Sequence, residues 1–313
     1  MTNFFENIPV RPRRSLLSVP AINVRALEKI RDLDCDGVIL DLEDSVAPDM
    51  KDKARENLDR LFSDAPFAGC ETIIRINPLS TPDGQADLKL VLSCRPDAVL
   101  LPKVEQPADI HEVADLLAEA DAPQGLKIWA MIETPLGVLN AASIADAAHT
   151  PDARLAAFVI GLNDLRKETR VPALPGRTYL VPWMMQVVLA ARAYGLDVID
   201  SVSNDFRDLA AFAGECEQGR AMGFDGKMLI HPAQIEPANR HFAPDEAMVA
   251  EAKEIIAAFV KPESVELNVI NMNGRMIERL HVGQAERLVA MAGIIAQRKA
   301  KKREGLSFHN RSR

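Results

Sequence analysis

The sequence lacks the features that mark membrane, secreted or disulfide-rich proteins. No apolar run in its 313 residues approaches the ~18 residues of a membrane helix. The stretch MTNFFENIPVRPRRS has no apolar signal core and carries Glu6, so we expect no secretory signal. Four dispersed cysteines (Cys35, Cys70, Cys94 and Cys216) form no CxxC pair. Their spacing argues against a disulfide frame or a zinc cage, and we expect reduced thiols in a cytoplasmic protein.

An excess of positive charge is also missing. Lys and Arg number 37 against 45 Asp and Glu, so the formal net charge is −8, which does not favour a nucleic-acid partner. The basic stretch KAKKREGLSFHNRSR at the C-terminus is expected to be a solvated tail. The chain has no GxxxxGK[ST] phosphate loop, no GxGxxG after a strand and no GxSxG nucleophile elbow. These absences argue against P-loop, dinucleotide-binding and serine-hydrolase chemistry.

Short β-rich runs recur along the chain, and each is continuously apolar. This pattern is typical of strands buried on both faces, as in a parallel sheet. The runs are SLLSV (15–19), GVILDL (37–42), TIIRIN (72–77), DAVLLPKV (97–104), LKIWAMIE (126–133), AAFVIGL (156–162), LDVIDSV (196–202) and DGKMLIH (225–231).

Between these runs lie helical patterns, in which apolar residues are spaced three or four positions apart. Examples are PADIHEVADLLAEA and VPWMMQVVLAARAYGL, and Gly195 and Gly223 stand where helices would end. Eight such βα units over roughly 240 residues predict an α/β fold, a (β/α)8 TIM barrel over residues 1–242. An open doubly wound sheet is the rival, but its glycine fingerprint is missing.

Residues 243–313 continue past the barrel. A helix is expected over 244–260, then a short β-like piece with a turn at Asn273-Gly274, and then a last helix, GQAERLVAMAGIIAQRKAKK. This extension is too short to form a core of its own. We therefore expect it to pack on a barrel or on a neighbouring subunit.

Polar and charged residues gather at the ends of the expected strands, where (β/α)8 enzymes carry their chemistry. Each alone has a structural explanation: Asp44 and Asp164, for example, could cap the helices that follow them. Several acids with an Arg and a Lys on one rim need mutual compensation or a metal ion, because buried charges are rarely left unpaired. The strand-end residues are Glu43, Asp44, Arg75, Asn77, Lys103, Glu133, Asn163, Asp164, Asp200 and His231.

Two carboxylates with no His or Cys at the neighbouring strand ends suit a hard cation. Mg²⁺, or Mn²⁺, fits such a donor set better than zinc. The ion would bind a 2-oxo acid through its carboxylate and carbonyl oxygens and polarise the carbonyl. Arg75 would then stabilise an enolate oxyanion. The pattern therefore indicates C–C bond chemistry.

The sequence also resembles the citrate lyase beta-subunit family, which includes malyl-CoA and citramalyl-CoA lyases and is related to hydroxy-oxo-heptanedioate aldolases. The resemblance covers roughly residues 12–292. As an ordered set, its motifs are specific for the family and much less so for the substrate. The matching stretches are RRSLLSVPAIN, GVILDLEDSVAPDMKDKAR, IIRINPLSTPDG, AVLLPKVE, WAMIETPLGVLNA, GLNDL, DFRDL, GFDGKMLIHPAQI and GRMIERLHVGQAERL.

The resemblance implies a (β/α)8 barrel in trimers or hexamers, in which the C-terminal segment completes a neighbour's site. By motif match, Glu133 and Asp164 would hold Mg²⁺, and Arg75 would bind substrate and stabilise the enolate. Glu43 and Asp44 of DLED would hold metal-bound waters.

Other matched positions concern the substrate. Arg25 and Lys29, one turn apart, stand where CoA-dependent members place a basic pair for CoA phosphates, although the pair could simply be a solvated helix face. Ile230 and His231 lie where family members contact substrate. The alternative for His231 is a structural hydrogen bond.

Three features depart from the family pattern. The catalytic acid/base, an Asp in a GxMID-like stretch, is replaced by Glu278 in GRMIE, one methylene longer. Ala21 replaces the Gly of the usual VPG-N turn. The loop LRKETRVPALPGRTYLVP adds basic residues that could face a more anionic acyl group or simply be solvated: Arg166, Lys167, Arg170 and Arg177.

We therefore expect a Mg²⁺-dependent lyase that cleaves a malyl- or citramalyl-CoA-like 3-hydroxyacyl-CoA to acetyl-CoA, or a similar thioester, and a 2-oxo acid. The alternatives are a CoA-independent aldolase on small hydroxy-oxo acids, a malyl-CoA thioesterase, and a non-catalytic lyase-like subunit. A Schiff-base aldolase through Lys103 is less favoured, because Lys103 is expected to pair with strand-end acids. The expected partners are a small CoA thioester or 2-oxo acid and further copies of the chain, with no nucleic acid and no membrane.

Overall fold

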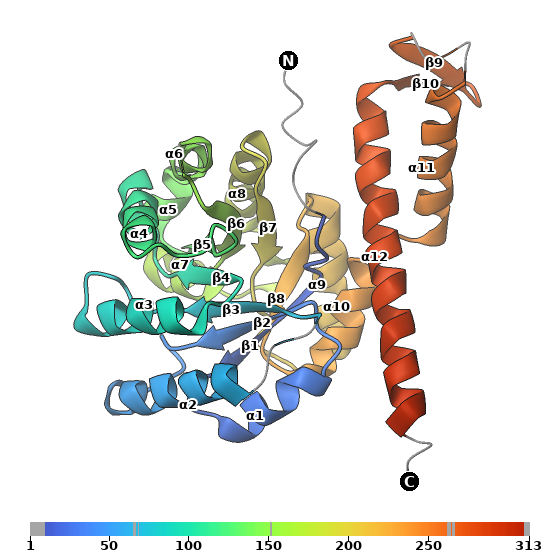
Figure 1. Ribbon diagram of the computed structural model, residues 1–313. Coiled ribbons are helices and arrows are strands. Elements are labelled where there is room, and N and C mark those ends of the chain that lie inside the picture. The colour runs from blue at the N-terminus through green and yellow to red at the C-terminus, as the bar shows by residue number, and fades with distance from the viewer. Residues whose placement is uncertain are drawn as a thin grey trace. The chain divides into compact units, whose positions relative to one another are not determined.

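The computed structural model describes residues 10–64, 67, 69–150, 152–261, 264 and 267–309, without the side chains of 301 and 303–309 (Figure 1). The chain divides into two compact units. One is Arg13–Phe242; the other contains residues 10–12 and the residues from Ala243 onward.

The larger unit is a closed barrel in which each strand pairs in parallel with its sequence neighbours and β1 closes onto β8. This arrangement confirms the predicted (β/α)8 fold. The strands are β1 (Ser15–Pro20), β2 (Gly37–Asp41), β3 (Glu71–Arg75), β4 (Ala98–Leu101), β5 (Lys127–Ile132), β6 (Leu155–Ile160), β7 (Asp197–Asp200) and β8 (Gly226–Leu229).

The strands are apolar on both faces because each strand contributes side chains to two cores, one inside the barrel and one between the barrel and the helices. Ile39 of β2 packs inside the barrel with Trp129 of β5. Its neighbours Val38 and Leu40 pack outward beneath the helices. Successive side chains of a strand point to opposite faces, so one continuous apolar run serves both layers.

Helices surround the barrel on its outside (Figure 1). Several begin at a proline in the first turn, where the missing N–H costs nothing. They are α1 (Val24–Lys29), α2 (Lys51–Asp64), α3 (Pro82–Cys94), α4 (Pro107–Glu119), α5 (Pro135–Leu139), α6 (Ala141–Asp146), α7 (Leu162–Thr169), α8 (Val181–Ala193), α9 (Leu209–Met222) and α10 (Ile235–His241), with short 3₁₀ turns that include η4 (Pro175–Arg177) and η5 (Pro232–Gln234).

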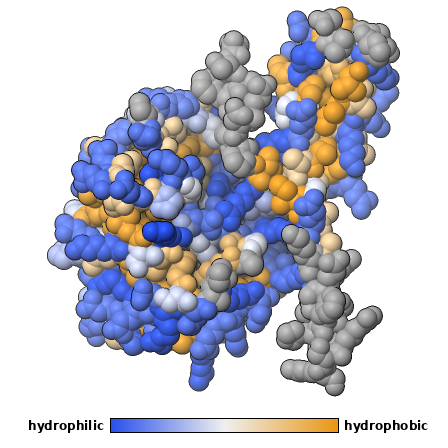
Figure 2. Space-filling view, viewed as in Figure 1, coloured by the Kyte–Doolittle hydropathy of each residue, from blue (hydrophilic) through white to orange (hydrophobic). Residues whose placement is uncertain are grey.

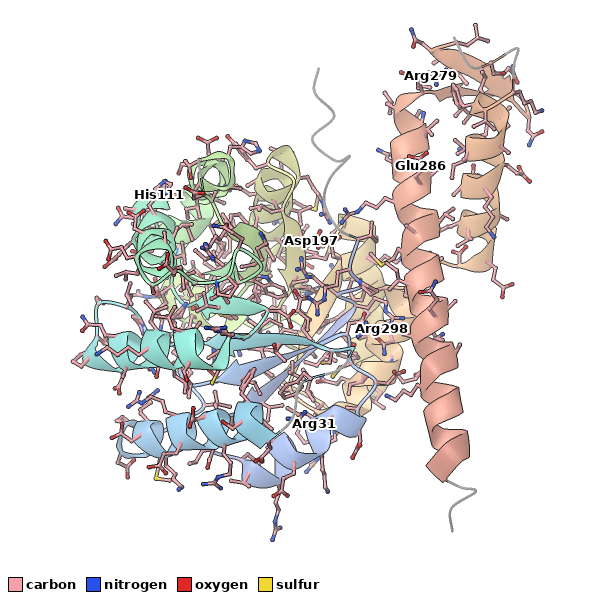
Figure 3. All side chains as sticks on the ribbon, in the orientation of Figure 1. Arg31, His111, Asp197, Arg279, Glu286 and Arg298 are labelled. Atoms are coloured by element: carbon pink, nitrogen blue, oxygen red, sulfur yellow. The ribbon has the colours of Figure 1, made fainter. Side chains whose placement is uncertain are left out.

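The N-terminal end of the barrel is closed by Arg13. Its guanidinium bonds Glu71 at the start of β3 and Asp197 at the start of β7, each at 2.7 Å; Asp197 is labelled in Figure 3. The same group lies 4.7 Å from the ring centroid of Trp129. Paired charges therefore seal this end, and a substrate site belongs at the opposite end.

The smaller unit contains a helical hairpin, α11 (Glu246–Phe259) and α12 (Leu280–His309), and a two-stranded antiparallel sheet, β9 (Val269–Met272) and β10 (Arg275–Glu278). The predicted turn at Asn273-Gly274 is present, with φ of 55° and 81°, as a tight hairpin requires. Helix α12 runs further than the sequence pattern indicated. No helix in the described part of the chain is long and apolar enough to cross a membrane.

The two faces of the β9–β10 sheet differ. Ile277 is buried, and Arg275 on the same face pairs with Glu251 of α11 at 2.6 Å. Val269, Met276 and Glu278 share the opposite face, where Val269 and Met276 are exposed. Figure 2 also shows hydrophobic residues on the α11–α12 helical hairpin. That this unit docks on a neighbouring subunit stays a prediction.

Candidate active site

A cavity of about 350 Å³ opens at the C-terminal end of the barrel. Acids and one arginine from four βα units line its polar side: Asp41 at the end of β2, Asp44 after β2, Arg75 of β3, Glu133 after β5 and Asp164 of α7. Apolar side chains line another part, namely Met131, Val202, Met228 and Ile230. The predicted convergence of strand-end charges is therefore present around one cavity.

Glu133 is buried in the cavity wall, with 1% of its surface exposed, the same fraction as Asp41. Its Oε1 accepts a hydrogen bond from the backbone N–H of Lys103 at 3.0 Å. Its Oε2 lies against Gly161, where an added Cβ would stand 2.5 Å from that oxygen. Gly161 of the GLNDL motif therefore leaves the space that the carboxylate occupies.

Burial raises the pKa of Glu133 to about 8. The charge of Arg75 opposes this shift, whereas the nearby carboxylates of Glu43 and Asp164 add to it. Without a cation, this carboxyl group therefore holds a proton at neutral pH. A cation next to Glu133 and Asp164 would replace that proton, because opposite charge favours the ionised form.

Arg75 is fixed by Asp41. Their side chains make two hydrogen bonds, Nε to Oδ1 and Nη2 to Oδ2, both 2.6 Å. Burial alone would raise the pKa of Asp41, but the hydrogen bonds and charge of Arg75 hold it below its ordinary value. The remaining nitrogen of Arg75, Nη1, lies 3.1 Å from Oε2 of Glu43 and 3.7 Å from Sδ of Met131. The guanidinium thus stays charged at the cavity wall.

The two predicted water-holding acids occupy different environments. Glu43 is 4% exposed, and its Oε1 accepts a hydrogen bond from Nζ of Lys103 at 3.1 Å. Lys103 is therefore paired with a strand-end acid, as expected, and is not the free amine that a Schiff base requires. Asp44 has an exposed side chain and stands 4.0 Å from Nη1 of Arg75.

Asp164 lies in the first turn of α7, partly exposed at the cavity. The helix start is held by Ser201, whose Oγ accepts the N–H of Leu162 at 3.0 Å. Asn163 exchanges side-chain hydrogen bonds with Asn204, at 2.9 and 3.2 Å. Ser201 and Asn204 both line the cavity and were missed in the sequence.

The donor set decides which metal would fit. Among the described residues, no group of three or more His, Cys, Asp or Glu side chains could hold an ion by itself. Zinc normally needs three or four protein ligands, so the site does not suit it. Mg²⁺ keeps several waters and commonly binds through one or two carboxylates plus its substrate. Glu133 and Asp164, with space beside them, fit this ion.

Five of the ten predicted strand-end residues lie outside the cavity lining: Glu43, Asn77, Lys103, Asp200 and His231. Asp200 is fully buried, bonded to Arg177 at 2.7 and 2.8 Å and to Lys227 at 2.9 Å. The idea that Arg177 faces an acyl group is therefore wrong, because a guanidinium buried on Asp200 is not available to the substrate. Asn77 is likewise buried, bonded to Lys51 and Asp87.

Ile230 and His231 follow each other directly after β8 but have different surroundings. Ile230 lines the cavity and is 40% exposed. His231 stacks on Phe206, with ring centroids 4.5 Å apart, and its Nδ1 accepts the N–H of Ala233 at 3.1 Å. This capping contact matches the structural alternative for His231.

Arg25 and Lys29 are both exposed on α1, one turn apart. Glu278 ends β10 in the smaller unit, and its backbone N–H donates to Nδ1 of His281 at 2.9 Å. The proposed roles of these three residues stay predictions.

Known proteins resemble the chain over most of its length. The family model "HpcH/HpaI aldolase/citrate lyase" matches residues 14–232. A (3S)-malyl-CoA thioesterase of Cereibacter sphaeroides is 44% identical over 285 residues, covering 91% of this chain and 96% of the relative. The mitochondrial citramalyl-CoA lyase of Homo sapiens is 31% identical over 297 residues, covering 92% and 87%.

A solved structure gives the same result. The protein CitE from Mycobacterium tuberculosis, in complex with magnesium, acetoacetate and coenzyme A, superposes with a TM-score of 0.71 at 28% identity, covering 91% of this chain and 99% of that chain. The family inferred from the motifs is thereby confirmed. The chain belongs to the HpcH/HpaI aldolase/citrate lyase family, a family of carbon–carbon lyases.

Proposed function

We propose that the protein is a Mg²⁺-dependent lyase that cleaves a C–C bond in a 3-hydroxyacyl-CoA of the malyl- or citramalyl-CoA type. The observation that carries this proposal is the cavity wall that brings Glu133 and Asp164 together with a fixed Arg75. Relatives named for malyl-CoA and citramalyl-CoA, and a structural neighbour that contains magnesium and coenzyme A, support the same chemistry.

Glu133 and Asp164 would hold the Mg²⁺, and Mn²⁺ could replace it. The bound ion would supply positive charge for the carboxylate and hydroxyl oxygens of the acyl group and would favour loss of the hydroxyl proton. Glu43 and Asp44 would orient waters around the ion. Oε2 of Glu43 is buried and makes no hydrogen bond, although it forms an ion pair with Nη1 of Arg75 at 3.1 Å.

Arg75 would bind the thioester end of the substrate. When the C–C bond breaks, its electron pair passes to the carbon next to the thioester, and negative charge develops on the thioester oxygen. A guanidinium fixed in advance stabilises that charge without reorganisation. Asp41 provides the fixation.

Two protons move during the reaction. One would pass from the substrate hydroxyl to solvent, through the waters that Glu43 and Asp44 would orient, as the hydroxyl becomes the carbonyl of the 2-oxo acid. The other would be delivered to the enolate carbon to give acetyl-CoA or a similar thioester. We assign the second transfer to Glu278 of a neighbouring subunit. The exposed β9–β10 face that carries Glu278, Val269 and Met276 suits such docking, and we expect a homotrimer or hexamer.

The CoA end of the substrate would lie toward Arg25 and Lys29, whose charges match its phosphates. The apolar side of the cavity would receive the carbon chain of the acyl group. A cytoplasmic location belongs to the same proposal; it is supported by four free cysteines and by the use of CoA esters.

Thioester hydrolysis is the second candidate, and one observation favours it. The relative at 44% identity is a (3S)-malyl-CoA thioesterase, whereas the citramalyl-CoA lyase is 31% identical. The same metal and Arg75 would serve hydrolysis, because a tetrahedral intermediate also places charge on the thioester oxygen. Glu278, which replaces the family's Asp, would then not need to protonate carbon.

Substitution of Glu133 tests what the two candidates share. Glu133→Ala and Glu133→Gln, assayed on malyl-CoA with Mg²⁺, should both lose turnover, since neither offers a carboxylate to the ion. Glu133→Gln keeps the size and the acceptor for Lys103, so it separates loss of charge from loss of packing. Full Mg²⁺-dependent turnover in either variant would overturn the proposed metal site.

A further inference from the structure

Lys103 has an unusual backbone for its place in the fold. Its φ is 49°, in the left-handed region that side chains with a Cβ rarely adopt. Arg95 and Arg170 share this conformation as C-caps of α3 and α7, and Asn273 does so in a hairpin turn, where it is common. Lys103 instead lies between β4 and α4, at the rim of the barrel.

The Lys103 N–H lies outside the strand ladder. Leu101 is the last residue of β4 in register with β5. Val104 already donates its N–H to the carbonyl of Met131 on β5, at 3.2 Å. Between them, the Lys103 N–H points to Oε1 of Glu133 at 3.0 Å. One residue of the chain is therefore displaced from the ladder to bind the buried acid.

The two carboxylate oxygens of Glu133 therefore have different surroundings. Oε1 is bound to Lys103, and Oε2 lies beside Gly161, next to the cavity. The ammonium of Lys103 contacts another acid, Glu43, at 3.1 Å. The backbone and the side chain of Lys103 therefore act on different carboxylates.

We propose that Lys103 is a positioning residue of the cation site, and that its left-handed backbone, not its ammonium group, aims Oε2 of Glu133 at the cation. The inference rests on the proposed magnesium site. A hydrogen bond to one oxygen fixes the rotation of the carboxylate, as groups beyond the direct ligands do in many metal sites. Strained backbone at such a site is a known way to hold a ligand in place.

The test compares substitutions that differ in backbone freedom. Lys103→Gly and Lys103→Asn remove the ammonium group, and both residues adopt the left-handed conformation readily. Lys103→Val also removes the ammonium group, but valine disfavours the left-handed conformation. Lys103→Ala is a milder form of the Val change. Mn²⁺ is the probe: its free concentration is read by electron paramagnetic resonance, and Mg²⁺ is added as competitor.

We expect Lys103→Gly and Lys103→Asn to bind Mn²⁺ within about threefold of the parent chain, and Lys103→Val to bind at least about tenfold more weakly. Arg95→Val is the matched control, since it strains the same backbone region at the end of α3. It should lower the melting temperature and leave Mn²⁺ affinity unchanged. If Lys103→Val does not fold, Lys103→Ala should still bind more weakly than Lys103→Gly.

Equal weakening in the Gly, Asn and Val variants would assign the effect to the ammonium and overturn the inference. Parent-like affinity in Lys103→Val would overturn it as well, as would a loss of affinity in Arg95→Val. A parent chain that binds no Mn²⁺ is a separate result. It would remove the proposed metal site itself, before any Lys103 variant is compared.

Discussion

Asp41 and Arg75 face each other across adjacent strands, in register, and share two hydrogen bonds of 2.6 Å. The pair fixes the guanidinium plane and leaves Nη1 as the nitrogen that Asp41 does not bind. Asp41 was not singled out in the sequence, although it stands in the same DLED run as Glu43 and Asp44. Its place in the site suggests how Arg75 acts and how to test it.

Arg75→Lys should lower kcat far more than it raises KM. Lysine keeps the charge but cannot make the two parallel hydrogen bonds to Asp41, so its ammonium is not held where charge develops. Loss of one such donor typically costs about 10²–10³ in kcat. Steady-state kinetics on malyl-CoA measures both constants. A kcat that stays within about threefold of the parent would show that a fixed guanidinium is not required.

Gly161→Ala should abolish metal binding while the barrel still folds. The added Cβ would stand 2.5 Å from both Cβ and Oε2 of Glu133. Such overpacking costs about 1–3 kcal/mol and displaces the carboxylate. Thermal melting and Mn²⁺ titration measure the two effects.

Gly214→Ala is the control for this change. Gly214 lies in α9 with nothing within 4 Å of an added Cβ, so alanine should stabilise the helix slightly and leave Mn²⁺ affinity unchanged. Unaltered Mn²⁺ binding in Gly161→Ala would contradict the assigned position of Glu133.

The pKa of Glu133, raised to about 8, predicts that metal binding releases a proton. The ordinary value is 4.5, so between that pH and about 8 the folded protein keeps a proton that the unfolded chain has lost. Folding therefore takes up this proton, and the contribution of Glu133 to stability falls as pH rises through that window. The cation must displace the proton, so its affinity should rise about tenfold per pH unit below pH 8.

Calorimetry in buffers of different ionisation enthalpy measures this release directly. At pH 7 we expect close to one proton released per Mg²⁺ bound. Glu133→Gln, which offers no carboxylate to the ion, should show neither Mg²⁺ binding nor proton release. No proton release from the parent chain would mean that Glu133 is already ionised before the cation arrives.

Arg25→Ala combined with Lys29→Ala separates CoA-dependent chemistry from a CoA-independent aldolase. The double substitution removes two exposed charges from α1 and should leave the fold intact. Apparent affinity for a CoA ester should drop by about tenfold, as expected when two phosphate contacts are lost. Cleavage of a small hydroxy-oxo acid should not change, and equal effects on both substrates would argue against a CoA site there.

The barrel could be predicted because its strands serve two cores. A strand such as β2 needs an apolar residue at nearly every position, which makes its sequence easy to recognise. The strand-end acids could be found for the same reason, since Glu133 interrupts an otherwise apolar run. The family motifs then restricted the chemistry.

Side-chain direction was harder to predict. Ile199 points into the barrel, so Ser201 two residues later lines the cavity, while Asp200 between them points outward to Arg177 and Lys227. The last residue of a strand thus faces the site only if it has the right parity. The sequence shows clearly where a strand ends, but it shows less clearly which side chains of that strand point into the barrel.

Glu278→Asp tests whether the longer side chain limits C–C cleavage. If Glu278 protonates the enolate, restoring the family's Asp should raise the rate of acetyl-CoA formation, because proton transfer needs a donor within about 2.6–3.2 Å. Mass spectrometry of products formed by parent and variant compares the two rates. Complete loss of cleavage in Glu278→Ala should accompany this result.

Product analysis with malyl-CoA, in the presence of Mg²⁺ and of EDTA, tests the central claim most directly. The lyase account predicts equal amounts of acetyl-CoA and glyoxylate, formed with Mg²⁺ and absent with EDTA. Free CoA and malate without acetyl-CoA would contradict it and would establish the thioesterase instead.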